Sequence, residues 1–380
     1  MTSIDLARYR AEFPITEQFA FLSHAAVSPV SRRVAAAVQQ SLSQAQAEPP
    51  GRYFATMLPL MRDLRQRIAT LINAARFDEI VLLPNTATGI NIAALSLPLV
   101  PGDNVLVLDG DYPANIYPWL NLAHRGVLTK FIPQHAGGLD LNLLEQRIDR
   151  RTRVIALSTV MFATGFRNDV AAVGQLCHER GIYFVVDAIQ SLGLWPIDVQ
   201  ACHIDFLAAG SQKWLLSTPG SGFLYCRHSL LDELGPGAYV GAASVVDVQN
   251  YLDYNFTFPH NASRFDLGTP NIIGAVALHA AISLLQEVGF ESIGAQVAQL
   301  IDTLINDLTQ RGYNLAASTA PEHRSGIIVA CVDDAATVCK HMEDAGVIVT
   351  PRGAGVRVAP HFYNTLAEVL RVGELLDHRT

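Results

Sequence analysis

Short apolar runs alternate with segments of helical spacing along most of the chain. The runs with the length of a strand occupy residues 79–84, 104–109, 153–160, 183–188, 205–210 and 222–226. Segments between them have helical spacing, such as 168–181, where Asp169 stands near the start and Gly181 at the end, as helix termini prefer. Strands that are apolar on both sides and separated by helices predict a mainly parallel sheet with helices on both faces. We therefore expect an α/β protein with a large domain over residues 21–260.

The pattern changes beyond this domain. Residues 271–310 have helical spacing almost throughout. They are followed by apolar runs at 326–332, 347–351 and 356–360 and a helical segment at 337–346. We expect a smaller α+β domain over residues 261–380, with an N-terminal segment, residues 1–20, packed against it. Ligands of open α/β sheets bind beyond the carboxyl ends of the strands, so the residues after each strand are the candidates for chemistry.

The composition narrows the class of protein. Half of the 380 residues are hydrophobic, which supports a folded core, and the formal net charge is -8. An acidic chain with no block of lysine and arginine argues against a nucleic-acid or anionic-membrane partner. No run reaches 18 consecutive apolar residues, and the N-terminus lacks a secretory pattern, so we expect no membrane span. The five cysteines are dispersed, which predicts free thiols in the cytoplasm rather than disulfides, and we predict no metal site.

Two strand ends offer a phosphate seat and an aromatic ring. Thr86 and Ala87 follow the first strand and begin a helix, whose free backbone N–H groups attract phosphate. The alternative is that Asn85 or Thr86 only caps this helix. Tyr112 follows the next strand, where its ring is able either to stack on a flat cofactor or to pack against the protein.

Two further strand ends carry charged groups in apolar surroundings. Asp187 needs a partner there, such as the cationic ring nitrogen of a ligand, unless it caps the following turn. Gln190, three residues on, is within reach of the same ligand. Lys213 follows the fifth run, with Ser211 and Gln212 before it. A partly desolvated lysine supplies the neutral amine that Schiff-base chemistry requires, and its apolar neighbours fit a plain surface lysine poorly.

Each of these signals is weak alone, but together they form a set. A phosphate seat, an aromatic plate, a buried carboxylate and a lysine amine are used together by pyridoxal 5'-phosphate (PLP). This cofactor binds a lysine as an imine and pairs its ring nitrogen with an acid. We therefore predict PLP as the cofactor.

Over nearly the whole chain the sequence resembles the class V aminotransferase and cysteine desulfurase family of fold-type I PLP-dependent enzymes. The motifs come in the same order. The family's phosphate turn appears as TATGIN from Thr86, its D-x-x-Q/H motif as Asp187 to Gln190, and its S-x-K motif as Ser211 to Lys213. The fold that this resemblance implies is the same large parallel-sheet domain with a smaller α+β domain.

The resemblance also implies a role for each of these positions. Lys213 binds the cofactor covalently, Asp187 pairs with the pyridine nitrogen, and Gln190 contacts the ring hydroxyl. Tyr112 occupies the stacking position. The phosphate contacts that the resemblance implies are Thr86, the Ala87 backbone, Ser211 and Gln212.

Two more motifs imply partners. GTPN at 268–271 matches a segment that reaches into a neighbouring subunit, so the resemblance implies that Thr269 contacts the partner's phosphate in a homodimer with shared active sites. RVAPHFYNT at 357–365 resembles the family's R-x-S-x-x-x-Y-N-T. Arg357 then holds the α-carboxylate of a small amino-acid substrate through a bidentate pair.

The chain also departs from the family. Desulfurases carry a nucleophilic cysteine on a mobile loop before that arginine, whereas TPRGAG at 350–355 is short and has no cysteine. Persulfide-forming chemistry is therefore not expected. Ala163 stands where many members have an asparagine that touches the substrate, and we expect Thr164 or Arg167 to compensate.

Two candidates are left with alternatives. His24 falls where the family's N-terminal segment borders the substrate, and an exposed loop histidine without a role is the other interpretation. Arg352 is either a second anion contact or a solvated side chain.

These residues predict a PLP-dependent enzyme that acts on a small amino acid through an external aldimine and a quinonoid. Lys213 is the expected general base and acid. An aminotransferase is the leading prediction, a cysteine or cystine C–S lyase is the alternative because such lyases share the short loop, and an epimerase comes third. A non-catalytic scaffold has no need of Lys213, Asp187 and Arg357, and a Rossmann dehydrogenase lacks its G-x-G-x-x-G.

Overall fold

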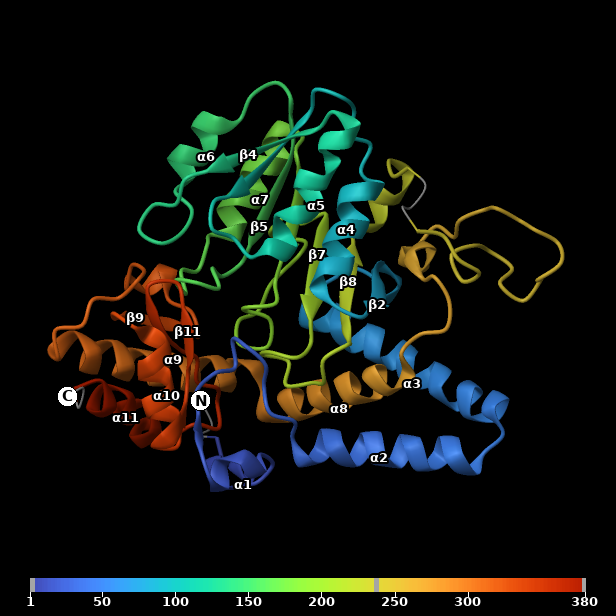
Figure 1. Cartoon of the computed structure of the whole chain (residues 1–380). Helices are drawn as coiled ribbons and strands as arrows, with labels where there is room; N and C mark the ends of the chain where they lie inside the picture. Colours follow the sequence, from blue (N-terminus) through green and yellow to red (C-terminus); the bar gives the residue numbers. More distant parts are fainter. Residues whose placement is uncertain (1–3, 236–238, 378–380) are drawn as a thin grey trace.

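A seven-stranded sheet forms the centre of the molecule (Figure 1). The structure is a computed structural model that describes residues 4–235 and 239–377. Outside the described residues lie 236–238 and the outermost parts of the predicted N-terminal segment and small domain, 1–3 and 378–380. The strands, in their order across the sheet, are β2 (Ile80–Leu83), β8 (Gly222–Cys226), β7 (Phe206–Gly210), β6 (Tyr183–Asp187), β5 (Thr152–Ser158), β3 (Asn104–Leu108) and β4 (Leu128–Ile132).

The sheet is mainly parallel, as predicted. Only β8 runs against its neighbours β2 and β7, whereas the pairs from β7 to β4 are all parallel. The carboxyl ends of these parallel strands therefore lie at one edge, and the turns that follow them meet there.

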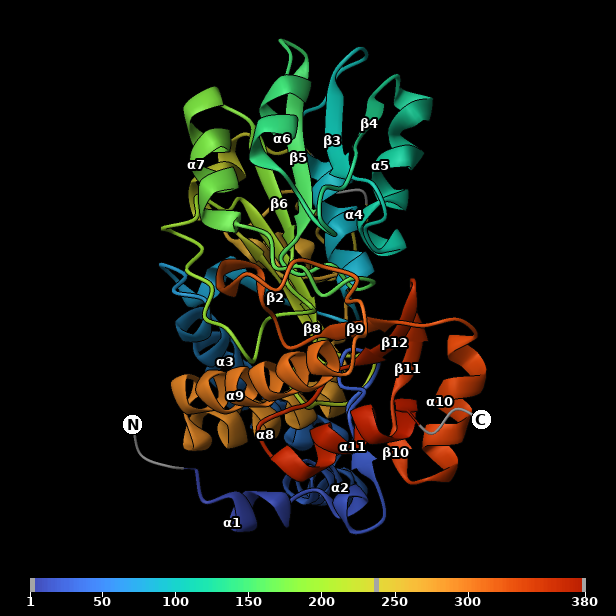
Figure 2. The ribbon, with the colours of Figure 1, turned by 90° about the vertical axis from the view of Figure 1, so that its left-hand side faces the viewer.

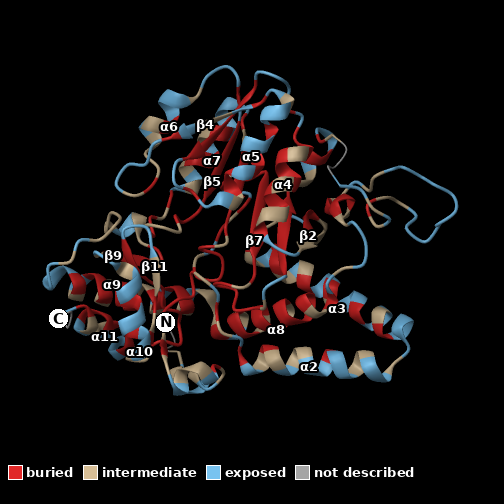
Figure 3. Ribbon diagram, viewed as in Figure 1, coloured by how far each residue is buried: buried red, intermediate tan, exposed pale blue. Residues whose placement is uncertain are grey.

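Both faces of the sheet are buried, which explains why its strands are apolar runs without alternation (Figure 3). On one face, Val105 and Val107 of β3 pack in a cluster with α4 (Thr86–Ser96) and α5 (Tyr117–Leu120). On the other face, Leu106 and Leu108 pack in a cluster with α3 (Pro50–Leu71), α6 (Leu141–Arg147) and α7 (Val170–Arg180).

The C-terminal part forms a smaller unit at the carboxyl edge of the sheet (Figure 2). Its antiparallel sheet has the order β11 (Thr350–Arg352), β12 (Gly355–Val358) and β9 (Ile328–Cys331), and its helices are α10 (Ala335–Asp344) and α11 (Leu366–Asp377). The N-terminal part joins it, because β1 (Ala20–Phe21) pairs in parallel with β10 (Val347–Ile348). The short α1 (Leu6–Arg10) precedes β1.

The long helical stretch after residue 270 is two helices. Gly289, with a φ of +90°, separates α8 (Ile272–Val288) from α9 (Phe290–Gln310). α8 packs against α2 (Arg32–Ala47) and α3, so this helix of the predicted small domain lies under the large one (Figure 1). Within the described ranges no single helix is long and apolar enough to cross a membrane; α8 and α9 pass only as a pair that bends by 78°.

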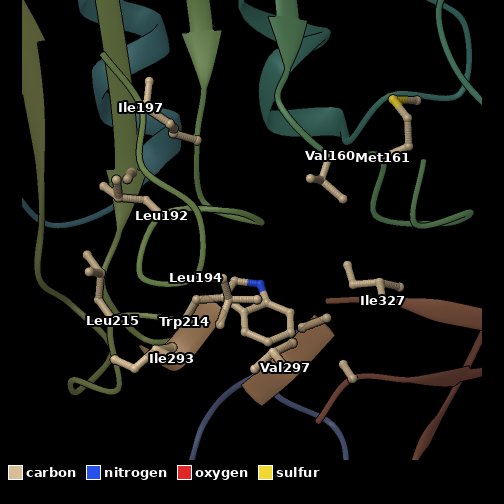
Figure 4. Close-up of a cluster of buried hydrophobic side chains, with 14 of the residues drawn as sticks. Val160, Met161, Leu192, Leu194, Ile197, Trp214, Leu215, Ile293, Val297 and Ile327 are labelled. Atoms are coloured by element: carbon tan, nitrogen blue, oxygen red, sulfur yellow. The ribbon is translucent and has the colours of Figure 1, made fainter. Parts of the chain in front are cut away.

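A continuous apolar cluster joins the two units (Figure 4). Trp214, which follows Lys213, lies in it with Leu194 from the large unit and with Val297 and Ile327 from α9 and the chain before β9. The turn that carries the lysine is therefore packed against the small unit.

Candidate active site

Lys213 lies in the turn after β7 and differs from the other two lysines of the chain. Lys130 is half-buried and Lys340 is exposed, and they form ion pairs with Asp149 and Asp344. Lys213 is only 8% exposed. Burial lowers its pKa to about 8, against a partial opposing effect of Asp187. Near physiological pH a larger share of this amine is therefore neutral than in an exposed lysine, as nucleophilic attack requires.

Asp187 is the last residue of β6 and is 2% exposed. It lies opposite Ala208 of β7 and Ser158 of β5 in the sheet register. Its Oδ1 accepts a hydrogen bond of 2.9 Å from the backbone N–H of Ile189. Burial raises the pKa of this carboxyl to about 7, and the charge of Asp111 acts in the same direction. A cationic group beside Asp187 would relieve the cost of its burial.

Asp111 organises the neighbouring strand end. Its carboxylate accepts hydrogen bonds from the backbone and hydroxyl of Ser158, from the side chain of Asn115 and from the N–H of Tyr112. These bonds fix the start of the Tyr112 segment. The ring of Tyr112 lies near the lysine, with its centroid 5.4 Å from Nζ of Lys213. The structure thus brings the predicted aromatic ring and the predicted amine together.

The start of α4 offers backbone donors, as predicted for a phosphate seat. Asn85 is the N-cap, and its Oδ1 accepts the N–H of Thr88 at 2.9 Å. Asn85 therefore does cap this helix. In the described part of the chain, however, the backbone N–H groups of Thr86 and Ala87 donate to no acceptor and stay free for a ligand. Thr86 Oγ1 accepts the N–H of Gly210, which ties this helix start to the end of the lysine strand.

Gly89 lets α4 lie close to the sheet. A Cβ at this position would be 2.8 Å from the Cβ of Ala208 on β7. A larger residue would push the helix start, with its donors, away from the strand that carries the lysine.

Ser211 and Gln212 lie between that strand and the lysine. The hydroxyl of Ser211 is hydrogen-bonded to Ser221 and to the carbonyl of Thr218, so it braces the following turn in this structure. Oε1 of Gln212 is buried and has no hydrogen-bond partner among the described residues. A buried amide end without a partner is costly, and a ligand that bonds to it would remove that cost.

Arg357 lies on β12 and is 2% exposed. Its Nη1 donates to the carbonyl of Phe162 at 3.0 Å, and its buried Nε has no partner. No carboxylate forms an ion pair with it within the described ranges. Burial lowers its pKa to about 10, with the charge of Arg352 as a further cause. An uncompensated buried guanidinium fits an anionic ligand.

Three predicted contacts are occupied by other partners. His24 is fully buried rather than an exposed loop residue; Nδ1 lies 2.8 Å from the carbonyl of Ala359 and Nε2 lies 2.6 Å from the hydroxyl of Tyr363. With both ring nitrogens engaged, the geometry argues against a substrate contact. Thr164 donates to the carbonyl of Gly137 at 2.6 Å and also accepts the N–H of Phe166, so its hydroxyl serves the loop.

Gln190 is the third of these. Its Oε1 accepts from the indole of Trp214, and its Nε2 donates to the carbonyl of Ala25. Arg167, the other expected substitute near Ala163, turns to the carbonyls of Pro321 and Glu322. A role of Gln190 at the cofactor hydroxyl stays a prediction.

Sequence reasoning missed the residues that hold the lysine turn. The backbone carbonyl of Trp214 accepts from Nε2 of His361 at 3.2 Å, and its indole bonds Gln190. Burial lowers the pKa of His361 to about 4, so the ring is neutral. His361 lies in the RVAPHFYNT motif, four residues after Arg357, so this motif could have pointed to it.

Thr269 lies on another part of the surface. It is exposed and lines an apolar cavity of about 310 Å³ with Leu82, Phe265 and Leu278. Lys213, Asp187 and Arg357 do not line this cavity. Its predicted contact with a partner's phosphate stays a prediction.

The gathered residues fit pyridoxal phosphate. Lys213 supplies an amine of lowered pKa for its aldehyde, and Asp187 supplies a buried carboxyl for its ring nitrogen. The N–H groups at the start of α4 suit its phosphate. The predicted contact of Gln212 with the phosphate stays a prediction.

Known proteins are similar to this chain in sequence and in fold. The chain is 28% identical to a probable cysteine desulfurase of Methanothermobacter thermautotrophicus, over 97% of this chain and 96% of that protein. It is 30% identical to an uncharacterized aminotransferase of Bacillus subtilis, over 95% of each. The apo structure of a cysteine desulfurase from Thermococcus onnurineus matches with a TM-score of 0.90 at 24% identity, over 99% of this chain and 98% of that one.

A cystine C–S lyase solved with its product, cysteine persulfide, matches with a TM-score of 0.88 at 22% identity, over 96% of this chain and 99% of that one. These matches confirm the predicted fold class. The family model for class V aminotransferases matches residues 20–375, nearly the whole chain. The cofactor of this family is pyridoxal phosphate, as predicted, and the protein belongs to the class V aminotransferase and cysteine desulfurase family.

Proposed function

We propose that this protein uses PLP to react with a small α-amino acid and that its reaction is transamination. One observation carries the substrate class: a buried guanidinium without a carboxylate partner, Arg357, acts electrostatically on a buried amine, Lys213. An α-amino acid carries a carboxylate, which would pair with Arg357, and an amine, which would react where Lys213 lies; both groups are bonded to its α-carbon. A bidentate pair with Arg357 would hold its carboxylate in a fixed orientation.

The protein's residues divide the work around the cofactor. When bound, PLP supplies an aldehyde that condenses with amines and a ring that takes up electrons released at the α-carbon. Asp187 would keep a proton on the ring nitrogen, which increases that electron uptake. Tyr112 would cover the ring, and the N–H groups at the start of α4 would hold the phosphate. The amine of Lys213 would remove the α-proton and return it at the acceptor carbon.

The pKa of Lys213 suits this transfer. A group that both takes and gives a proton works best when its pKa lies near the working pH. Burial brings the pKa of Lys213 to about 8, whereas an exposed lysine would stay protonated.

A cysteine or cystine C–S lyase is the second candidate. The similarity to proteins named cysteine desulfurases supports it. A persulfide on a protein cysteine has no support, because burial raises the pKa of all five cysteine thiols. The turn between β11 and β12, Gly353 and Ala354, carries no cysteine. This lyase would therefore release its sulfur product into solution.

A single-turnover absorbance experiment separates the two candidates. The PLP-loaded protein is mixed with alanine, glutamate, cysteine and cystine in turn, without an acceptor. Transamination converts the cofactor to its pyridoxamine form and releases an oxo acid. If the aldehyde form persists while pyruvate and sulfur products accumulate, the protein is a lyase. No cofactor change with any of the four would reject the proposal.

Borohydride reduction tests the assignment of the lysine. Peptide mapping should find the reduced cofactor on Lys213 and on neither Lys130 nor Lys340, because both of these amines are paired with carboxylates. The cofactor on another lysine would contradict the site.

We also propose that the protein is a homodimer and works in the cytoplasm. Exposed apolar side chains on the segment before Thr269 support the dimer; they are Tyr251, Leu252, Tyr254 and Phe256. All five cysteines are free thiols, which suits a reducing compartment. Light scattering across a dilution series tests the dimer, and a monomer that keeps full activity would contradict it.

A further inference from the structure

Two arginines project from the same face of the small sheet. In the β11–β12 pair, Thr350 lies opposite Arg357 and Arg352 lies opposite Gly355. Successive side chains along a strand point to opposite faces, so Arg352 shares a face with Thr350 and therefore with Arg357. Arg352 and Arg357 are diagonal neighbours, whose Cβ atoms lie about 7 Å apart in such pairs.

This face is turned toward the active site of the large unit. Arg357 donates to the backbone carbonyl of Phe162. The ring of Phe162 packs edge-on against the ring of Tyr112, with 5.1 Å between the two ring centroids. The turn of the hairpin also touches the large unit, because a Cβ on Gly353 would be 2.8 Å from the carbonyl oxygen of Ala163. Figure 2 shows β11 and β12 side by side at this boundary.

The charges of the two arginines act on the same amine, that of Lys213. After burial and Asp187, the charges of Arg357 and Arg352 are the causes that shift the pKa of Lys213, and both lower it. Arg352 also lowers the pKa of Arg357. The charges of Arg352 and Arg357 thus disfavour the positive charge of Lys213, an arrangement that bound anions would stabilise.

Arg352 has no acidic partner within the described residues. Its Nη1 donates to the carbonyl of Pro351, the residue before it. An exposed arginine is ordinary by itself, and two other arginines of the small unit do pair with carboxylates, Arg311 with Asp377 and Arg324 with Asp302. Arg352 instead lies on the same face of the hairpin as Arg357.

We propose that Arg352 determines specificity by binding a second carboxylate of the substrate. Arg357 holds the α-carboxylate, as the proposed function on which this inference rests requires, and Arg352 holds a distal one. The site then selects dicarboxylic α-amino acids. Glutamate and aspartate belong to this class, and so does cystine, whose far half carries a carboxylate. Alanine and cysteine satisfy only Arg357.

Kinetics of the holoenzyme test the proposal directly. In the Arg352→Gln variant, kcat/KM should fall about 10-fold or more for glutamate, aspartate or cystine, whichever the wild type uses, because a charge-assisted hydrogen bond is lost. For alanine and cysteine it should change less than about 2-fold. The Arg352→Lys variant should keep part of the preference. Equal losses for both groups of substrates would overturn the proposal.

Arg371→Gln is the matched control. Arg371 is an exposed arginine of the same small unit, and it also donates to a backbone carbonyl, that of Ala345. Its loss removes the same charge from the unit but should leave the ratio between dicarboxylic and monocarboxylic substrates unchanged. A shift as large as that in Arg352→Gln would mean that net charge alone sets the preference, which would also overturn the proposal.

Calorimetry separates this inference from the proposed function. Succinate should bind to the holoenzyme at least about 10-fold more tightly than propionate, and Arg352→Gln should abolish that difference. If no amino acid reacts, the proposed function fails, but the affinities for succinate and propionate still show whether Arg352 binds a second carboxylate. Equal binding of succinate and propionate to the wild type would reject the second carboxylate site.

Discussion

At the scale of single residues, the site is made of charges that the fold leaves without full compensation. Asp187 and Arg357 are both 2% exposed, yet neither is paired with an opposite charge in the described part of the chain. Burying a charge in this way costs stability unless a ligand completes the pair. A cofactor with a cationic ring nitrogen and a substrate with a carboxylate would supply both missing partners. Binding energy is thus concentrated where the chemistry occurs.

Asp187→Asn should separate stability from function. The folded carboxyl has a pKa of about 7, raised by burial from 3.8, so the folded protein binds more protons between these values than the unfolded one. Stability therefore falls as the pH rises through this range and stays low above it. Without cofactor, at pH 8, Asp187→Asn should be more stable than the wild type by roughly 1–3 kcal/mol in urea unfolding.

The same variant should lose activity. Asparagine keeps the hydrogen bond from Ile189 but cannot hold a proton on the cofactor ring, so kcat/KM should fall at least about 100-fold. A cofactor-free variant that is less stable than the wild type at pH 8, yet fully active when loaded, would contradict both parts of the argument.

Lys213 should titrate near pH 8 in the cofactor-free protein, because burial disfavours its charged form. Pulse acetylation at a series of pH values, read by mass spectrometry, gives the midpoint for each lysine. Lys340 is the internal control, since its hydrogen bond to Asp344 raises its pKa above 10.5. Equal midpoints for the two lysines would show that the turn after β7 does not desolvate Lys213.

At the scale of elements, the strands that form the site could be predicted because both their faces are buried. β3, β5, β6 and β7 are continuous apolar runs, and the residues after them were found by position alone. β4 was missed because it is an edge strand, LTKFI, in which only Ile132 is fully buried. The split between α8 and α9 was also missed, since apolar spacing continues through Gly289.

The hairpin β11–β12 shows what the sequence does not contain. Its strand pattern was visible, but its contact with the loop around Ala163 joins residues almost two hundred positions apart. No local pattern reports such a contact. The roles of the hairpin in carrying Arg357 and Arg352 to the site therefore depend on packing.

Gly353→Val tests whether this contact positions the arginines. Gly353 has a φ of +55°, and a side chain there would meet the carbonyl of Ala163 at 2.8 Å. The hairpin should shift away from the large unit, so KM for the amino acid should rise about 10-fold while the affinity for PLP stays unchanged. Steady-state kinetics and cofactor titration measure the two effects.

Gly181→Val is the control for backbone strain. Gly181 has a similar φ of +63°, but a Cβ there has nothing within 4 Å. Both variants should lose about 1–3 kcal/mol of stability from the strained conformation. Only Gly353→Val should raise KM; an equal rise in both would mean that general destabilisation, and not the hairpin contact, causes the effect.

At the scale of the whole molecule, the two ends of the chain close around the lysine turn. Phe13 stacks on Tyr363 at 3.9 Å, and Tyr363 in turn bonds His24. Trp214, next to Lys213, lies beside both His24 and His361. The sequence pointed to His24 as a substrate contact because it falls where the N-terminal segment of the family borders the substrate, with a loop histidine without a role as the alternative. In the folded chain it instead joins the N-terminal and C-terminal segments beneath the site.

The hydrogen bonds of His24 settle its tautomer. Nδ1 faces the carbonyl oxygen of Ala359, which only accepts, so Nδ1 carries the proton and Nε2 accepts from the hydroxyl of Tyr363. Burial holds the pKa of His24 well below its usual value, so the ring stays neutral. Tyr363 is therefore the donor on which the buried Nε2 depends.

Tyr363→Phe removes this donor and keeps the ring that stacks on Phe13. The buried Nε2 of His24 loses its partner, so the free energy of unfolding should fall by about 1–3 kcal/mol. KM for the amino acid should stay within about 2-fold of the wild type, because both ring nitrogens of His24 are bonded to the protein and we expect His24 to support the fold. Tyr183→Phe, which removes a hydroxyl bonded to the exposed Glu233, should change stability by less than about 0.5 kcal/mol. A large rise in KM with unchanged stability would contradict this and would support a contact between His24 and the substrate.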